Sequence, residues 1–265
     1  KLRETIHLPG NSWWPLWCAV ALAIVCISLL VRAYPVALIA FVVAVGLLLR
    51  WSWENGAHPR AAPDATVAPG QPPLHSRTMR GPGVWLMSVT HLANGSLFLS
   101  LLFGWFYLWT VAPEWQMPAA SPLSLPLLLG AGAAITLGTL WLGALVRRLR
   151  HGSDSGLGGG MYLIAALGAL QSLLLGFVIW QAELAPTQTA HDATLLVALL
   201  YVLLHGMLGA LLCLLQGLRV GYGYVSAQIP LEPVVVLSLW RYNLITYWIV
   251  LVAIWGLPTL LGGAS

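Results

Sequence analysis

The sequence predicts an all-α polytopic membrane protein. Of its 265 residues, 59% are hydrophobic and only 8% are charged, and the mean hydropathy is +0.83. A soluble domain of ordinary composition carries roughly a quarter charged residues, because its surface faces water. The apolar residues also gather in long runs separated by short polar stretches, as in a chain that crosses a bilayer several times. These observations define the expected fold class.

Seven apolar segments account for most of the chain. They cover residues 13–31, 34–50, 84–111, 123–146, 161–181, 193–218 and 234–257. Each reaches the lower limit of about 17 residues for a helix that spans the hydrocarbon core. The first two are separated by only a few residues around Arg32, so we expect them to form a tight antiparallel pair. The sequence therefore predicts seven transmembrane helices.

The third segment is the clearest single span, because residues 84–110 carry no charged side chain. Trp85 lies near one end and Trp109 near the other, where an aromatic ring can sit at the level of the lipid headgroups. The middle of the segment contains His91 and Asn94, which lipid would not solvate. We therefore expect these two side chains to face the inside of a helix bundle.

A proline-rich stretch divides the chain into two groups of helices. Five prolines lie between Pro59 and Pro73, together with histidines, arginines and small residues. Such a composition is typical of a hydrated loop or linker. The sequence predicts a two-helix transmembrane pair in residues 1–50, a hydrophilic linker in residues 51–83 and a five-helix bundle in residues 84–265.

The distribution of lysine and arginine predicts the orientation of the helices. With seven spans, the N-terminus and the loops after the second, fourth and sixth helices lie on one side of the membrane. That side, together with Arg241 just inside the seventh segment, holds all of the 12 Lys and Arg residues except Arg32. Positive residues concentrate on the cytoplasmic side. We therefore expect the N-terminus inside and the C-terminus outside.

The titratable residues argue against several functions. All eight Asp and Glu residues lie in loops or at helix ends, whereas an autonomous proton pump usually needs a carboxylate within the membrane. Cys18, Cys26 and Cys213 show no Cys-x-x-Cys spacing, and only His91 and His205 lie deep in the apolar segments. We therefore expect no metal or cofactor bound by this chain and no catalytic residue. The few charged residues give no sign of a nucleic-acid partner, and we expect none.

Two sets of residues are the candidates for function. Polar side chains within the segments are expected to form interhelical hydrogen bonds or to contact water: His91, Asn94, Gln171, His205 and Asn243. Aromatic and basic side chains near the membrane surface are expected to bind lipid headgroups: Trp51, Trp53, Arg219 and Arg241. For the polar set, a water chain or a lipid headgroup site is the alternative to interhelical hydrogen bonds, and an aromatic belt alone would also explain Trp51 and Trp53.

Short motifs occur in order along almost the whole chain, near the ends or middles of the segments. They are Asn11-Ser12-Trp13-Trp14-Pro15-Leu16, Arg50-Trp51-Ser52-Trp53-Glu54, Phe106-Tyr107 with Ala112-Pro113, Pro122-Leu123-Ser124-Leu125-Pro126-Leu127-Leu128, His205-Gly206 and Trp240-Arg241-Tyr242. Together they resemble the motifs of subunit III of the haem-copper (cytochrome c) oxidases. The division into two and five helices, the topology and the chain length also agree with that family.

The sequence departs from the family at its polar positions inside the membrane. The family's intramembrane glutamate falls on Gly95, with His91 one turn earlier. The second histidine of helix six becomes Leu208, the histidine of helix seven becomes Arg241, and the aspartate that follows it becomes Leu244. We do not expect His91 to take over the role of the missing glutamate. The resemblance therefore implies a divergent member that keeps the scaffold.

The resemblance implies a non-catalytic subunit III, or subunit III-like domain, that stabilises the catalytic subunit and binds phospholipid in the cleft between the helix groups. Haem and copper would lie in partner subunits of an oxidoreductase complex that reduces oxygen and pumps protons. The electron donor would be cytochrome c or quinol. Subunit I would be a partner, either as a separate chain or fused to this one. The expected location is the bacterial inner membrane, with the mitochondrial inner membrane as the alternative.

Two other functions fit the composition. An independent seven-helix transporter or small-molecule-binding protein would use His91, Asn94, His205 and Arg241 as its polar site. Transporters often contain internal repeats with broken helices, and no such repeat is visible in the sequence. An assembly factor related to subunit III, but not retained in the complex, is the third hypothesis.

Overall fold

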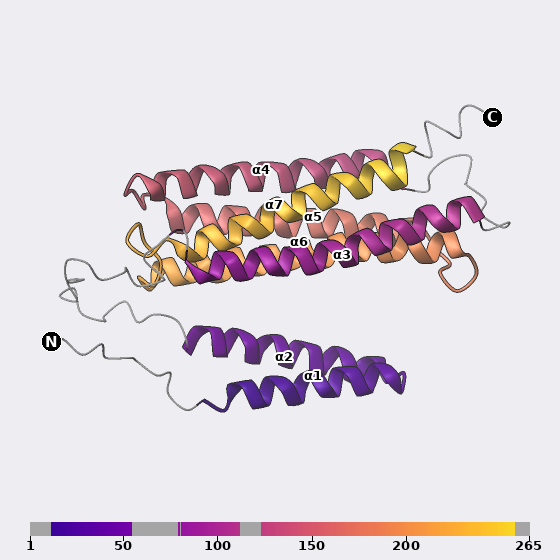
Figure 1. Cartoon of the computed structure of the whole chain (residues 1–265), viewed down its shortest axis with the longest axis horizontal. Coiled ribbons are helices and arrows are strands. Elements are labelled where there is room, and N and C mark those ends of the chain that lie inside the picture. Colours follow the sequence, from indigo (N-terminus) through magenta and orange to yellow (C-terminus); the bar gives the residue numbers. More distant parts are fainter. Residues whose placement is uncertain (1–11, 55–78, 80, 112–122, 258–265) are drawn as a thin grey trace. The chain divides into compact units, whose positions relative to one another are not determined.

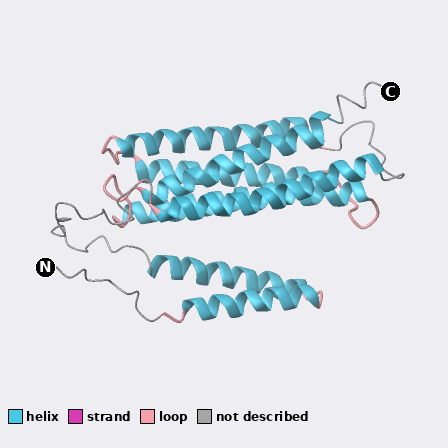
Figure 2. Ribbon diagram, in the orientation of Figure 1, coloured by secondary structure: helices cyan, strands magenta, loops and turns pink. Residues whose placement is uncertain are grey.

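The computed structural model describes residues 12–54, 79, 81–111 and 123–257, and these residues are almost entirely helical (Figure 2). In chain order the helices are α1 (Trp14–Leu30), α2 (Tyr34–Glu54), α3 (Pro82–Val111), α4 (Leu125–Arg150), α5 (Leu157–Gln181), α6 (Ala190–Gly221) and α7 (Leu231–Leu251). A π-helical turn, η2 (Val252–Gly256), continues α7. Figure 1 labels the helices and colours them along the chain.

Six of these helices are long and apolar enough to cross a membrane: α2 to α6, and α7 together with η2. The remaining helix, α1, is apolar but has only 17 residues. The protein is therefore an all-helical, multi-pass membrane protein. The seventh span remains a prediction, because α1 lies at the lower limit of spanning length. The orientation of the helices is also a prediction, because it rests on the distribution of Lys and Arg alone.

The helices cover the seven predicted segments, but several extend further than the sequence pattern indicated. The sequence assigns residues 51–54 to the linker, whereas they form the last turn of α2. It ends the fourth segment at residue 146, whereas α4 continues through Arg150. Long basic side chains reach water while their backbone stays helical, and cations are favourable at a helix C-terminus. The rest of the predicted linker, residues 55–78 and 80, lies outside the described residues.

The chain forms two compact units, residues 1–63 and 64–265. In the first unit, α1 packs against α2. The buried side chains of this pair are small: Cys18, Ala21, Ser28, Ala37, Ala40 and Ala44. Small side chains allow two membrane helices to approach closely. The turn between the helices is closed by Arg32, whose φ of 59° is left-handed, and by a 2.8 Å hydrogen bond from the Ala33 N–H to the Ser28 carbonyl.

The second unit contains α3 to α7. Helix α5 packs against α4 and α6, α7 packs against α4 and α6, and α3 lies against α6 and α7 (Figure 1). The core of the unit surrounds Trp240 of α7, which is completely buried. Glycines at positions 138, 168 and 209 face its indole ring from α4, α5 and α6. Helices α4 and α6 therefore pack closely against α7, and the tip of the Trp240 ring reaches α5.

Local sequence explains where several helices begin. Pro15 lies in the first turn of α1, where its missing N–H has no intrahelical partner to lose. Thr189 precedes α6, and its hydroxyl accepts a 3.1 Å hydrogen bond from the Asp192 N–H, as is typical of an N-cap threonine. Gly156 precedes α5 with a φ of 73°, a left-handed conformation that glycine adopts at little cost.

Candidate functional site

Polar and aromatic side chains from α3, α6 and α7 meet inside the second unit. We call this group the tyrosine–histidine cluster: His91 of α3, Tyr201 and His205 of α6, and Ser238 and Tyr242 of α7. Residues four apart lie on the same face of a helix. Each of α6 and α7 therefore presents two cluster residues towards its neighbours.

His91 joins α3 to α7. Its Nε2 atom lies 3.0 Å from the Ser238 hydroxyl oxygen, and its ring stacks on Tyr242 with centroids 4.9 Å apart and planes 3° from parallel. Its Nδ1 atom is buried and has no hydrogen-bond partner among the described residues. An unpaired buried acceptor is tolerated better than an unpaired N–H donor. The favoured tautomer therefore has Nε2–H donating to Ser238 and leaves the lone pair of Nδ1 unpaired.

The two tyrosines join α6 to α7 and α3. Their hydroxyl oxygens are 2.5 Å apart, and the Tyr201 O–H also donates to the Asn94 backbone carbonyl at 3.3 Å. A tyrosine has a single O–H donor. Either hydroxyl can donate across the pair, and both bonds form together when the Tyr242 O–H donates to Tyr201 and the Tyr201 O–H donates to the Asn94 carbonyl. The chain of donors thus runs from α7 through α6 to α3.

His205 lies beside both tyrosines. Its ring centroid is 4.2 Å from that of Tyr201 and 5.9 Å from that of Tyr242. Nδ1 lies 2.9 Å from the Tyr201 backbone carbonyl, which only accepts, so Nδ1 carries a hydrogen. The His205 carbonyl in turn accepts a 2.8 Å hydrogen bond from Asn243 Nδ2. These contacts fix the orientation of both side chains.

The structure places the other predicted polar residues around this cluster. Asn94 is half-buried and contributes its backbone carbonyl to the cluster. Asn243 is buried and adjoins the cluster through His205. Gln171 is 1% exposed and lies on α5 against Gly206 of α6. The five predicted polar residues therefore occupy two neighbouring parts of one bundle.

The predicted lipid-binding residues lie in different environments. Arg219 is only 4% exposed, and its guanidinium donates two hydrogen bonds to Glu232, at 2.8 Å and 2.7 Å. Arg241 is exposed on α7, and Trp51 and Trp53 are half-buried in the last turn of α2, in the first unit. Lipid binding by these four residues stays a prediction, and Arg219 already has an anionic partner within the protein.

Sequence reasoning missed three of the cluster residues. Tyr201 and Ser238 were not distinguished from the aromatic and small residues that ordinarily line membrane helices, and Tyr242 was named only as part of the Trp240-Arg241-Tyr242 motif. The available signal was their spacing: Tyr201 lies four residues before His205, and Ser238 lies four residues before Tyr242. Sequence reasoning also missed Glu232, although Arg219 and Glu232 carry opposite charges on either side of one short turn.

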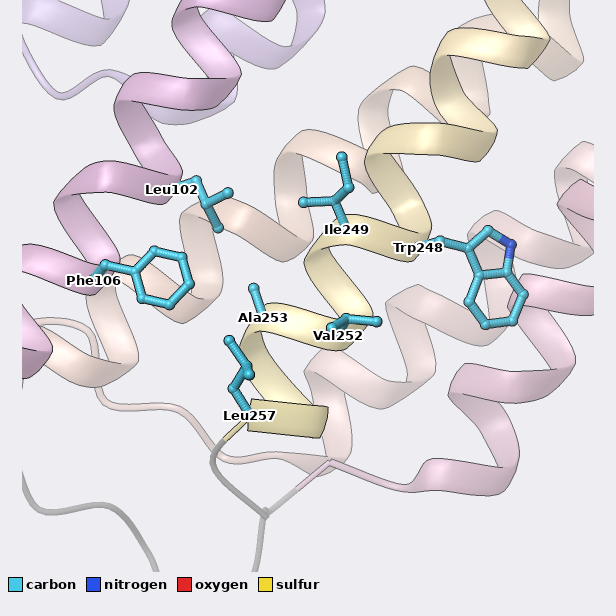
Figure 3. A pocket seen from close by; sticks show the side chains of 7 residues that line it. All are labelled: Leu102, Phe106, Trp248, Ile249, Val252, Ala253 and Leu257. Atoms are coloured by element: carbon cyan, nitrogen blue, oxygen red, sulfur yellow. The ribbon is translucent and has the colours of Figure 1, made fainter. Parts of the chain in front are cut away.

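An apolar groove lies between α3 and the end of α7 (Figure 3), and none of the cluster residues lines it. Its volume is about 390 Å³, and it is lined by Leu102, Phe106, Trp248, Ile249, Val252, Ala253 and Leu257. The indole N–H of Trp248 donates to the Thr136 hydroxyl at 3.2 Å. The groove therefore offers apolar contact and no reactive group.

The chemistry of the cluster is hydrogen bonding. Within the described ranges, no group of three His, Cys, Asp or Glu side chains is arranged to hold a metal ion. The hydroxyl and imidazole groups of the cluster bind one another or backbone carbonyls, and they connect α3 to the other helices. The fold and this site define an all-helical multi-pass membrane protein with a polar cluster inside its bundle.

No protein-family model matches the chain, and no curated protein matches it.

Proposed function

We propose that the chain is a non-catalytic subunit III, or subunit III-like domain, of a terminal haem-copper respiratory oxidase. The observation that carries the proposal is the order and placement of its motifs. Trp14-Pro15-Leu16 opens α1, residues 50–54 end α2, Phe106-Tyr107 lies near the end of α3, His205-Gly206 lies within α6, and Trp240-Arg241-Tyr242 lies within α7. The motifs at the start of α1 and near the ends of α2 and α3 lie where the resemblance leads us to expect them, which supports the proposal.

The helix grouping supports the same proposal. The chain has one compact unit with α1 and α2 and a second with α3 to α7, as the two-plus-five division requires. In this proposal all seven helices span the membrane, with the N-terminus inside and the C-terminus outside. The proposed location is the bacterial inner membrane, with the mitochondrial inner membrane as the alternative.

The proposed role is mechanical. The second unit has a closely packed core around Trp240, in which α4, α5 and α6 approach α7 at glycines. A core of this kind resists deformation, because packed interiors have little free volume. It would brace a catalytic subunit I, separate or fused, that carries the haem and copper and performs oxygen reduction and proton pumping. Phospholipid would bind at headgroup level through exposed Arg241 and through Trp51 and Trp53.

Affinity purification tests this proposal. The chain is tagged and purified in a gentle detergent, and the proteins that accompany it are identified and quantified. We expect a large, histidine-rich partner in a stoichiometric amount. An assembly factor would carry the same partner in much smaller amounts. A lone 28.5 kDa protein would contradict the subunit proposal.

A second candidate is an independent transporter or small-molecule-binding protein. It is favoured by one observation: His91, His205 and two tyrosines from three helices converge in a single cluster. If the chain purifies alone, ligand binding is measured for the wild type and for His91→Leu. Binding that depends on His91 would support this candidate, and unchanged binding would contradict a site in the cluster.

A further inference from the structure

Three helices meet at one level around Trp240. A Cβ atom added at Gly168 of α5 would lie 3.2 Å from Trp240 Cη2, and one added at Gly209 of α6 would lie 3.2 Å from Trp240 Nε1. The indole N–H donates to the Gly209 carbonyl at 3.3 Å. Residues 168, 209 and 240 therefore form one layer of the bundle.

The next layer of the bundle lies about one turn further along α5 and α7, towards their C-terminal ends. Three residues on from Gly168 and Trp240 are Gln171 and Asn243. Because α6 runs in the opposite direction, its residue in this layer is Gly206, three residues before Gly209. Three residues rise by about 4.5 Å along a helix. Gln171, Asn243 and Gly206 therefore lie at about the same height along the axis of the bundle.

Gln171 and Asn243 approach α6 from neighbouring directions. The Gln171 amide covers Gly206 so closely that a Cβ there would lie 2.8 Å from Gln171 Cδ. Asn243 Nδ2 lies 3.3 Å from the position of a Cβ at Gly209. Three residues turn a helix by about 300°, so residues 206 and 209 are about 60° apart around α6. The two amides therefore lie against neighbouring parts of α6, and Oε1 is the Gln171 atom nearest to Gly206.

Both amides have a buried oxygen without a hydrogen-bond donor. Gln171 is 1% exposed and Asn243 is 4% exposed, and no described group donates to Gln171 Oε1 or Asn243 Oδ1. The orientation of Asn243 is fixed, because its Nδ2 donates to the His205 carbonyl and a flipped amide would place two oxygens together. Buried polar groups in native proteins nearly always have a partner, often an ordered water.

We propose that one ordered water molecule lies between α5, α6 and α7 and donates one hydrogen bond to Gln171 Oε1 and the other to Asn243 Oδ1. Two acceptor oxygens cannot bond to each other, whereas a water molecule brings two O–H donors. A metal cation would need more oxygen ligands than these two amides supply. The water connects α5 to α7, each of which packs against α6. This inference does not depend on the proposed function.

A density map of the wild-type protein, purified alone or in its complex, tests the proposal directly. We expect a water peak at hydrogen-bond distance, about 2.6–3.2 Å, from both oxygens. The proposal is overturned if the space holds no peak or holds a peak with the coordination of a cation. It is also overturned if the Gln171 amide N–H is found donating to Asn243.

Infrared spectroscopy with isotopically labelled water provides a second test. Bands that shift when D₂¹⁸O replaces D₂¹⁶O belong to water. We expect Gln171→Met, which removes one acceptor, to shift or abolish one such band, and Asn243→Leu to affect the same band. Ser172→Ala is the matched control on α5, because its hydroxyl already donates to the Gly168 carbonyl at 2.9 Å. An identical band pattern in all four proteins contradicts the proposal, and the wild-type map decides the question if a variant does not fold.

Discussion

Two faces of α7 are built in different ways, although the residues that define them are only two positions apart. Two residues turn a helix by about 200°, so Trp240 and Tyr242 point to nearly opposite sides. Trp240 is completely buried and faces glycines of α4, α5 and α6. Tyr242 is half-buried and contacts α3 and α6 through a ring stack and a hydroxyl pair.

Packing around Trp240 holds α4 to α7 together, whereas the contacts of Tyr242 attach α3 to this group of helices. On the Trp240 side, shape complementarity leaves no room for an extra methyl group. On the Tyr242 side, individual hydrogen bonds of modest net strength connect side chains that, apart from buried Tyr201, are half-buried. We therefore expect substitutions on the first face to be far more damaging than substitutions on the second.

The largest effect is expected for Gly138→Leu. A Cβ at this position would already overlap the Trp240 ring, and overpacking a tight core typically costs 1–3 kcal/mol or more. We expect the free energy of unfolding to fall by about 3 kcal/mol, measured by unfolding in detergent. Gly104→Leu on α3 is the control, since a Cβ at Gly104 meets no atom within 4 Å. Equal losses in the two variants would contradict a steric clash with Trp240 as the cause.

A smaller loss is expected for Arg219→Ala, which leaves Glu232 without the cation that joins α6 to α7. Breaking a buried ion pair costs about 3–5 kcal/mol, but Glu232 is 33% exposed, so water offsets part of the loss. We expect about 2 kcal/mol in the same unfolding measurement. Arg150→Ala removes an exposed cation at the end of α4 and should change stability by less than about 0.5 kcal/mol. A neutral Arg219→Ala would show that the pair does not join the helices.

On the second face, Tyr242→Phe removes a hydroxyl but keeps the ring that stacks on His91. The loss of one hydrogen bond is worth about 1 kcal/mol. Tyr107→Phe is the control, because Tyr107 is 53% exposed on α3 and should change stability very little. A loss for Tyr242→Phe as large as that for Gly138→Leu would mean that the tyrosine–histidine cluster belongs to the rigid core.

In the proposed oxidase complex, the smallest functional effect is expected for His91→Leu. His91 contacts Ser238 and Tyr242 within the protein, and these contacts position α3. We therefore expect normal proton uptake, measured as the rate and stoichiometry of proton consumption during turnover. Slower proton uptake with unchanged assembly would show that His91 has taken over the role of the missing glutamate.

The sequence predicted the helices well, because their length and apolar character are local properties. It predicted their ends less well at Glu54 and Arg150, where composition indicates a loop although the backbone remains helical. His91 and His205 were identified because polar residues are conspicuous in apolar runs. The Trp240 layer was not predictable, since it depends on which glycines of three other helices face one ring. The Arg219–Glu232 pair likewise required the turn between α6 and α7 to bring the two charges together.

The reduced-minus-oxidised visible spectrum of the purified, tagged protein tests the central proposal most directly. The account predicts haem a-type or related bands, with a constant ratio of haem to this chain through successive purification steps. Because this chain is proposed to bind no haem itself, the bands would report a tightly held catalytic partner. A colourless preparation that contains only this chain would contradict the account.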